Sequence, residues 1–438
     1  MADSQNYISK SHQDGKSLLP LLAEQNYFHY NDNNELFCEN VSIKTIADEV
    51  GTPFFVYSKK YFTDKYQTMS RALAGCDFKI FYAVKSNYNI NIINILRELG
   101  AGADVNSLGE MYRALKAGVP ANEILLGGVG KSAEEIKFAI EKDIFLFKVE
   151  SESELLLINS IANDLGKIAR VALRVNPDVD PHTHPYISTG LAENKFGIAL
   201  KEAEAIYLNS RLSSIQFTGI DMHIGSQIFS IAPYKAAIEK ILNLCQRLKA
   251  AGINLHHIDI GGGYGIEYAG GKDFEFDAFS KEIVPLLKNS GMKIFLEPGR
   301  YFSANSGALI AKVLYLKKNG DKNFVIADAG MSELIRPSLY GAYHEIVPVS
   351  SSGKSEKMYD VVGPLCESGD FLGKDIPLAE PAPNDLLAIL SAGAYSMVMS
   401  SNYNARMRPP EILVDNGKWH IIRKRESLMQ LIQNEELV

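Results

Sequence analysis

KIFYAVKSNYNINIINILRELGAGADVNSLGEMYRALKAGVPANEILLGG, residues 79–128, contains the pattern that decides the fold. Short apolar segments at 79–85, 102–107 and 124–128 alternate with two segments whose apolar residues recur every three or four positions and which stop at glycine. Continuous apolar runs indicate strands covered on both faces, and the intervening segments are typical of amphipathic helices. The stretch therefore predicts repeated strand–helix units of a parallel sheet.

The same alternation continues toward residue 300. Further strands are predicted at 146–151, 171–176, 217–225, 257–263 and 293–300. Eight units in about 250 residues predict a (β/α)8 barrel. A doubly wound open sheet is the alternative, but no GxGxxG motif opens the first unit, and GGGYG comes only after the seventh strand.

The rest of the chain lacks this alternation. After residue 304, short strand-like runs separated by turn residues predict a mostly β domain at 305–438. The segment 21–50 has the pattern of a hairpin that joins this domain, and residues 1–20 are expected to form a flexible tail. With the barrel at 51–304, we expect an α/β protein built of a barrel and a β domain.

Composition argues against several classes of protein. The 438 residues carry 45 Lys and Arg against 52 Asp and Glu, a net charge of −7 that disfavours nucleic-acid binding. Hydrophobic residues make up 46%, as in globular proteins with large cores, yet no run approaches the roughly 20 apolar residues of a membrane span. The four scattered cysteines predict neither disulfides nor a zinc site, and no secretory signal is expected. We expect a cytoplasmic protein without membrane or nucleic-acid partners.

Polar residues end four of the predicted strands, at the edge where a barrel carries its chemistry. They are Lys85, His223, Gly261–Gly263 and Glu297–Arg300. Singly, each has an ordinary structural explanation, such as a snorkelling lysine, a core histidine, a glycine turn or an ion pair. Together they suit pyridoxal phosphate, because lysine binds its aldehyde, histidine stacks on its ring, glycines bind its phosphate and glutamate stabilises its protonated ring nitrogen.

Further motifs resemble the diaminopimelate decarboxylase family, which uses pyridoxal phosphate. In chain order they are FYAVKSN, HIGSQI, GGGYG, EPGRY, RPSLYGAYH, GPLCESGD and AGAYSMVMSSNYN. HIGSQI together with CESGD is specific, whereas GGG or EPGR alone is shared by related decarboxylases. The resemblance implies an alanine-racemase-like TIM barrel (fold type III) with a C-terminal β domain, working as a homodimer. It also implies release of CO2 from the D-centre of meso-diaminopimelate to give L-lysine, the last step of lysine biosynthesis.

The same resemblance implies roles for single residues. Lys85 would bind the cofactor covalently, His223 would lie against its ring and Glu297 would bond its ring nitrogen. The other cofactor-binding residues would be Ser226, Gly262, Gly263, Pro298, Gly299, Arg300 and Tyr395. The substrate would be bound by Arg300, Arg336, Tyr340, Glu367 and Tyr395. Catalytic roles would fall to Lys85, His223 and Cys366, and Cys366 and Glu367 would enter the partner subunit's active site.

These residue types fit the chemistry of a substrate with a second amino-acid centre. A guanidinium offers a planar fork to the distal carboxylate, and Glu367 offers an anion to the distal ammonium, which also helps to reject substrates that lack it. Cys366 can donate a proton to the carbanion left when CO2 departs. An arbitrary cysteine is more often a small packing residue, but the neighbouring Glu367 and the preceding GPL favour the functional interpretation.

Other interpretations stay open at this point. Ornithine, arginine or carboxynorspermidine decarboxylases share the fold but have an altered motif at Cys366–Ser368. A racemase would need a second acid or base on the opposite cofactor face, and a non-catalytic carrier could lose the lysine. No metal is expected, since His182 and His184 are better explained as part of a loop near the substrate. Asp104 and Arg174 end strands, where they either support the cofactor or form ion pairs.

Overall fold

The fold is taken from a computed structural model, which describes residues 27–180, 195–269, 272–351 and 355–438. Their contacts divide the chain into two compact units. The first contains Thr63–Ile266 and Lys272–Phe302; the second contains the described residues up to Phe62, a short segment that starts at Glu267, and Ser303–Val438. No helix of these described ranges is long and apolar enough to cross a bilayer.

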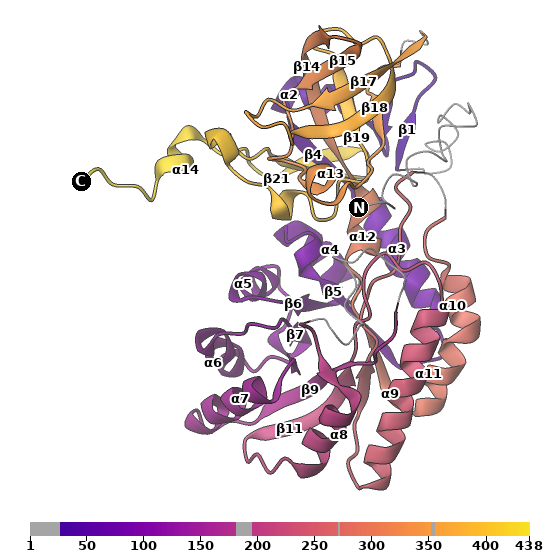
Figure 1. The fold of residues 1–438 in the computed structure, drawn as a ribbon, viewed down its shortest axis with the longest axis vertical. Coiled ribbons are helices and arrows are strands. Elements are labelled where there is room, and N and C mark those ends of the chain that lie inside the picture. Colours follow the sequence, from indigo (N-terminus) through magenta and orange to yellow (C-terminus); the bar gives the residue numbers. More distant parts are fainter. Residues whose placement is uncertain (1–26, 181–194, 270–271, 352–354) are drawn as a thin grey trace. The chain divides into compact units, whose positions relative to one another are not determined.

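Eight parallel strands form a closed barrel in the first unit (Figure 1). Neighbours around the ring follow the order of the sequence, and the ring closes where the last strand pairs with the first. The strands are β5 (Phe78–Ala83), β6 (Gly102–Val105), β7 (Ile124–Leu126), β8 (Leu146–Val149), β9 (Ala169–Asn176), β11 (Ile215–Asp221), β12 (His257–Asp259) and β13 (Lys293–Leu296). A short strand, β10 (Ile198–Ala199), adds to β9. All eight predicted strands are present, so the barrel is confirmed.

Helices cover the outer face of this barrel (Figure 1) and explain why β6 and β8 are buried at every residue. They are α4 (Ile90–Glu98), α5 (Leu108–Lys116), α6 (Ala133–Lys142), α7 (Glu152–Asp164), α8 (Leu200–Asn209), α9 (Ala232–Ala250), α10 (Phe276–Glu282) and α11 (Val284–Ser290). α3 (Lys59–Ala72) leads into the unit. Ser107, Ser132 and Ser151 cap three of these helices by accepting a backbone N–H bond, which fixes where each helix begins.

The barrel interior is filled by aromatic side chains near the beginning of β12. His257, the first residue of β12, stacks on Phe295 with ring centroids 4.6 Å apart, and Phe81 meets Phe295 edge-on at 5.0 Å. Burial lowers the pKa of His257 to about 3, helped by His256 and Lys293, so its ring is neutral at pH 7. This packing fills the barrel interior near the beginning of β12, whereas barrels of this kind bind their ligands at the opposite rim, where the strands end.

The second unit is mostly β structure, as predicted for its C-terminal part. Its large sheet has the order β18-β17-β15-β14-β4-β20-β21, and β19 joins it by pairing with β14 and β16. The strands are β4 (Phe54–Ser58), β14 (Gly307–Asn319), β15 (Lys322–Ala327), β16 (Ile346–Pro348), β17 (Glu356–Val362), β18 (Phe371–Ala379), β19 (Leu386–Ile389), β20 (Glu411–Asp415) and β21 (Lys418–Arg423). Among its described residues the unit also contains the helices α2 (Ile43–Val50), α13 (Arg336–Tyr340) and α14 (Leu428–Ile432).

The strand β4 falls inside the range 51–304 expected for the barrel, yet it lies in this sheet. All five of its residues are buried, and it pairs antiparallel with β14 and parallel with β20. The early segment forms a small sheet of β1 (Phe28–Tyr30), β2 (Leu36–Cys38) and β3 (Val41–Ser42). Leu36 donates its N–H to Val349 O at 2.7 Å, so the early segment packs on the β sheet. Segments from both ends of the described chain thus build one unit.

Candidate active site

The candidate site lies at the carboxyl ends of the barrel strands, where predicted residues follow β5, β11, β12 and β13. Lys85 lies just beyond β5 in a short 3-10 turn, Val84–Ser86, and its side chain is exposed. Glu297 is buried and comes directly after β13. The two strand ends are joined, since Ala83 donates its N–H to Pro298 O at 3.1 Å. The predicted lysine and glutamate therefore follow neighbouring strands of the same barrel.

His223 lies two residues beyond β11 and contacts the glycine turn after β12. The backbone N–H of Gly262 donates to Nδ1 of His223 at 3.2 Å. Burial lowers the pKa of His223 well below its usual value, and the cations of Arg174, Lys85 and Lys148 lower it further. The ring is therefore neutral, and its face is suited to lie against another aromatic ring.

The loops after β11 and β12 are held against one another by their backbones. Ile228 donates its N–H to Gly263 O at 3.0 Å, and Tyr234 of α9 donates its hydroxyl to Gly262 O at 2.8 Å. Gly263 has a φ of 97°, and a Cβ on it would lie 2.2 Å from the carbonyl oxygen of Gly225. Only glycine permits this approach, which makes the turn a cradle of the kind that binds phosphate through backbone N–H groups.

Arg300 brings a positive charge to the same loops. It opens the short helix α12 (Arg300–Ser303) and is buried. Its Nε and Nη2 both donate to Oγ of Ser226, each at 3.3 Å. A buried guanidinium beside a hydroxyl is suited to an anionic group of a cofactor or substrate.

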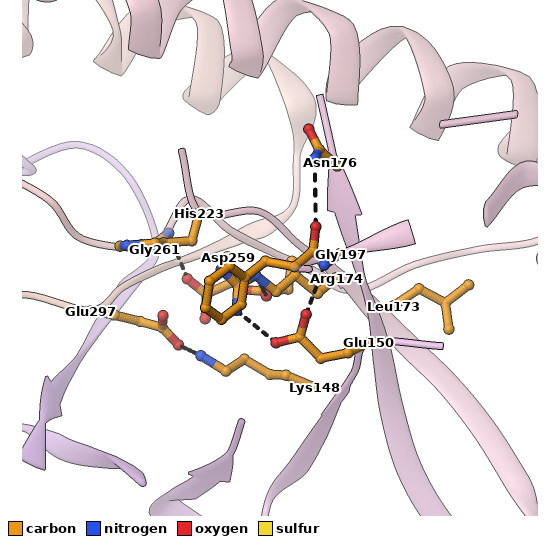
Figure 2. A network of polar contacts seen from close by, with 12 residues as sticks. Lys148, Glu150, Leu173, Arg174, Asn176, Gly197, His223, Asp259, Gly261 and Glu297 are labelled. Atoms are coloured by element: carbon orange, nitrogen blue, oxygen red, sulfur yellow. Dashed lines mark hydrogen bonds and ion pairs between the residues drawn. The ribbon is translucent and has the colours of Figure 1, made fainter. Parts of the chain in front are cut away.

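Buried carboxylates gather near the strand ends, among them Asp259 and Glu297 (Figure 2). Oxygen atoms of Asp221, Asp259 and Glu297 lie within 4.8 Å of one another. Burial raises the pKa of Asp221 to about 7, with Glu297 adding to the rise and Lys148 opposing it. Burial also raises the pKa of Asp259 well above its usual value, and Glu297 and Asp221 raise it further. The interior therefore favours bound protons and cations.

Three buried ion pairs connect this interior to the neighbouring strands. Lys148 Nζ lies 2.9 Å from Asp104 Oδ1 and also bonds Glu297 Oε1. Arg174 Nη1 donates to Glu150 Oε1 at 2.6 Å (Figure 2). Asp104 and Arg174, for which the sequence left two roles open, thus both form ion pairs at strand ends.

Arg336, Tyr340, Cys366, Glu367 and Tyr395, predicted as site residues, belong to the second unit. Arg336 opens α13 and is buried, with its guanidinium 4.7 Å above the ring of Tyr268. Tyr340 ends α13, and Tyr395 has a left-handed φ of 55°.

His344 orients the guanidinium of Arg336. Its Nδ1 lies 2.9 Å from the carbonyl oxygen of Leu390, so Nδ1 carries the proton. Nε2 is then an acceptor, and Arg336 Nη1 donates to it at 2.8 Å. The neutral imidazole and the ring of Tyr268 together hold the arginine side chain in one orientation.

Cys366 and Glu367 are exposed in an adjacent loop of the second unit. The Cys366 N–H donates to Asn404 Oδ1 at 3.0 Å. A hydrogen bond from Tyr403 to Glu367, together with the negative charge of Glu367, raises the pKa of the Tyr403 hydroxyl. The predicted pair thus lies on the surface of this chain.

Four buried charged residues near the strand ends were not predicted from the sequence: Lys148, Glu150, Asp221 and Asp259. A signal was available, because each is a charged residue in or next to a buried part of a barrel strand. The partners of these residues come from other strands and could not be inferred locally. His182 and His184, which the sequence analysis weighed as metal ligands, lie outside the described residues.

The barrel rim fits pyridoxal phosphate. Lys85 offers an exposed amine, and Glu297 offers a buried carboxylate. His223 offers a neutral ring. Gly263 lies in a turn whose free space would be taken up by the Cβ of any other residue. The pyridoxal-binding domain of pyridoxal-dependent decarboxylases matches residues 59–304, more than half of the chain. The barrel fold, the residues at its rim and the match to this domain together define a pyridoxal-phosphate-dependent decarboxylase with an alanine-racemase-like barrel.

Individual relatives narrow this class. The diaminopimelate decarboxylase of Aquifex aeolicus is 46% identical over 95% of this chain and 99% of its own length. The diaminopimelate decarboxylase of Haemophilus influenzae is 47% identical over 93% of this chain and 98% of its own length. The structure of diaminopimelate decarboxylase from Helicobacter pylori complexed with L-lysine is 41% identical, with a TM-score of 0.86, and covers 90% of this chain and 98% of its own. The chain belongs to the diaminopimelate decarboxylase family.

Proposed function

We propose that this protein releases CO2 from the D-centre of meso-diaminopimelate and forms L-lysine, the last step of lysine biosynthesis. The observation that carries the proposal is the near full-length likeness to diaminopimelate decarboxylases, at 42–47% identity, in a chain that also has the rim residues such chemistry needs. Relatives with other substrates share the fold, but the motifs around Cys366 and Glu367 are those expected for a substrate with a second amino-acid centre.

Pyridoxal phosphate, when bound, supplies an aldehyde and an electron-withdrawing ring that accepts the electron pair left by CO2. Lys85, whose side chain is exposed at the rim, would hold the aldehyde end. Glu297 would bind the ring nitrogen and keep a proton on it. His223, whose ring is neutral, would lie against the cofactor ring.

The phosphate would be bound around the glycine turn. Its ligands would be Ser226, Gly262, Gly263 and Tyr395, and the remaining cofactor-binding residues would be Pro298, Gly299 and Arg300. The pairing of Arg300 with Ser226 at 3.3 Å supports this, because a guanidinium and a hydroxyl converge beside the turn.

The distal end of the substrate would be recognised by charge. Arg300 and Arg336 would bind its carboxylate, with Tyr340 and Tyr395 beside them, and Glu367 would bind its ammonium. The orientation of Arg336 by His344 and Tyr268 supports this role, because a fixed planar fork discriminates better than a mobile one. A substrate without the distal ammonium would leave Glu367 without its partner.

Cys366 would give the proton that replaces CO2 on the reacting carbon. We propose that it does so in the active site of a partner subunit, so that the working form is a homodimer. The exposure of Cys366 and Glu367 on this chain supports the assignment. All four cysteines are free thiols, which supports a reducing compartment, and we propose the cytoplasm.

The test is CO2 release from a panel of amino acids at equal concentration: meso-diaminopimelate, its LL isomer, ornithine, arginine and lysine. We expect release from meso-diaminopimelate alone, with L-lysine as the second product. Faster release from ornithine or arginine would overturn the proposed substrate and favour the related decarboxylases.

A further inference from the structure

A lysine reaches Glu297 from inside the barrel. Lys148 is the third residue of β8, and its side chain is only 5% exposed. Its Nζ bonds Glu297 Oε1 and lies 2.9 Å from Asp104 Oδ1, so one cation joins two carboxylates from β6 and the end of β13 (Figure 2 shows the contact with Glu297). Lys148 was not predicted as a site residue from the sequence, and it has no role in the proposed reaction described above.

The charges around Lys148 show why it stays a cation. Burial alone would lower its pKa, but the carboxylates of Asp104, Glu297, Asp221 and Asp259 outweigh burial and hold the pKa well above its usual value. Without Lys148, Asp104 and Glu297 would be buried carboxylates without that counter-ion, a costly state that a protein relieves by taking up a proton or by moving the side chain.

We propose that Lys148 is a positioning residue, which holds the Glu297 carboxylate as an oriented anion behind the ring of pyridoxal phosphate. Lys148 binds Oε1, which leaves Oε2 to accept a hydrogen bond from the protonated ring nitrogen. A protonated or displaced Glu297 could not hold that proton, and the ring would lose its capacity to accept electrons. The inference rests on the proposed role of Glu297.

The side chain of Lys148 packs closely against Gly127, which follows β7. A Cβ at position 127 would lie 2.9 Å from Cε of Lys148. Its φ is not in the left-handed region, so alanine at 127 would displace the lysine without straining the backbone or removing a charge. Gly130 lies in the same loop, and a Cβ on it would meet nothing within 4 Å, which makes it the control.

The experiment measures the ring nitrogen directly in the holoenzyme. Wild type and the variants Lys148→Met, Gly127→Ala, Gly130→Ala and Glu297→Gln are loaded with pyridoxal phosphate labelled with 15N in the ring, and the 15N chemical shift and kcat are recorded. We expect a protonated nitrogen in wild type and Gly130→Ala. In Lys148→Met and Gly127→Ala the signal should move toward that of the unprotonated ring, and kcat should fall on the order of 10- to 100-fold, as for a catalytic group displaced by about an ångström.

The outcomes separate the inference from the function on which it rests. A protonated nitrogen and wild-type kcat in Lys148→Met, or in Gly127→Ala if the lysine variant does not fold, would overturn the role of Lys148. A protonated nitrogen in Glu297→Gln would instead overturn the role of Glu297 itself. Lys148→Arg, which keeps the charge, should recover part of the protonated signal.

Discussion

At the scale of single residues, Lys85 carries the most direct prediction. It is exposed at the rim beyond β5, where its amine is free to react with an aldehyde. Lys85→Ala should lose the visible absorbance that borohydride reduction abolishes in wild type, and turnover should fall by several orders of magnitude. Absorbance spectra before and after reduction check the first expectation, and CO2 release checks the second. A variant that keeps both the band and the rate would contradict the assignment.

Glu297 is the second residue at this scale. Glu297→Gln keeps the shape of the side chain but removes the anion that stabilises the ring proton. The variant should still bind pyridoxal phosphate, while kcat should fall on the order of 100-fold or more, the usual effect of removing one preorganised electrostatic contact. Cofactor titration together with kcat separates binding from chemistry. An unchanged kcat would show that the reaction does not need this carboxylate.

The sequence was informative about residues at strand ends and uninformative about residues between strands. Lys85, His223 and Glu297 were predictable, because a polar residue after an apolar run is visible locally. Lys148 was not, because its partners Asp104 and Glu297 come from other strands, and only closure of the barrel brings them together. A buried ion pair is a product of topology, so one chain segment cannot reveal it.

At the scale of elements, the beginning of β12 predicts how stability depends on pH. His257 is buried in the aromatic cluster, Nε2 has no hydrogen-bond partner within the described ranges, and its folded pKa is about 3 against an unfolded value of 6.5. Between these two values the unfolded state binds the extra proton, so the free energy of unfolding falls as pH falls. From pH 7 to pH 5 this histidine should contribute a loss of about 2 kcal/mol.

Urea unfolding of wild type and His257→Gln at several pH values checks this prediction. The variant cannot titrate at this position, so its stability should decline less on acidification between pH 6.5 and pH 3, and below the folded pKa the two proteins should depend on pH alike. Parallel declines in the two proteins would mean that His257 takes up its proton in the folded barrel.

Among the elements, the eight barrel strands were predictable and β4 was not. FFVYS is a continuous apolar run, and such a run looks the same in a parallel barrel and in the middle of a packed β sheet. Its neighbours, β14 and β20, lie far away in the sequence. The assignment of a strand to a sheet depends on these distant pairings.

At the scale of the whole molecule, a shared active site predicts complementation. If Cys366 acts in the partner subunit's site, Lys85→Ala and Cys366→Ala are inactive alone but should recover activity when mixed and allowed to exchange subunits. Equal amounts give about half mixed dimers, each with one intact site, so about a quarter of the wild-type activity should return. Labelled subunits establish that exchange has occurred. Background activity after exchange would place both residues in one subunit's site.

The position of β4 also bears on how the polypeptide is made. During synthesis β4 leaves the ribosome long before β14, because about 250 residues lie between them. At about 5–20 residues per second, these residues take on the order of 12–50 s to synthesise. Throughout that time a mostly apolar strand, which is fully buried in the finished protein, has neither of the neighbours that later cover its edges. An unpaired strand of this composition readily joins a like strand of another nascent chain. Nascent chains should therefore depend on chaperones, or on early folding of the barrel that emerges between the two strands. This dependence should be stronger than the stability of the finished protein would suggest.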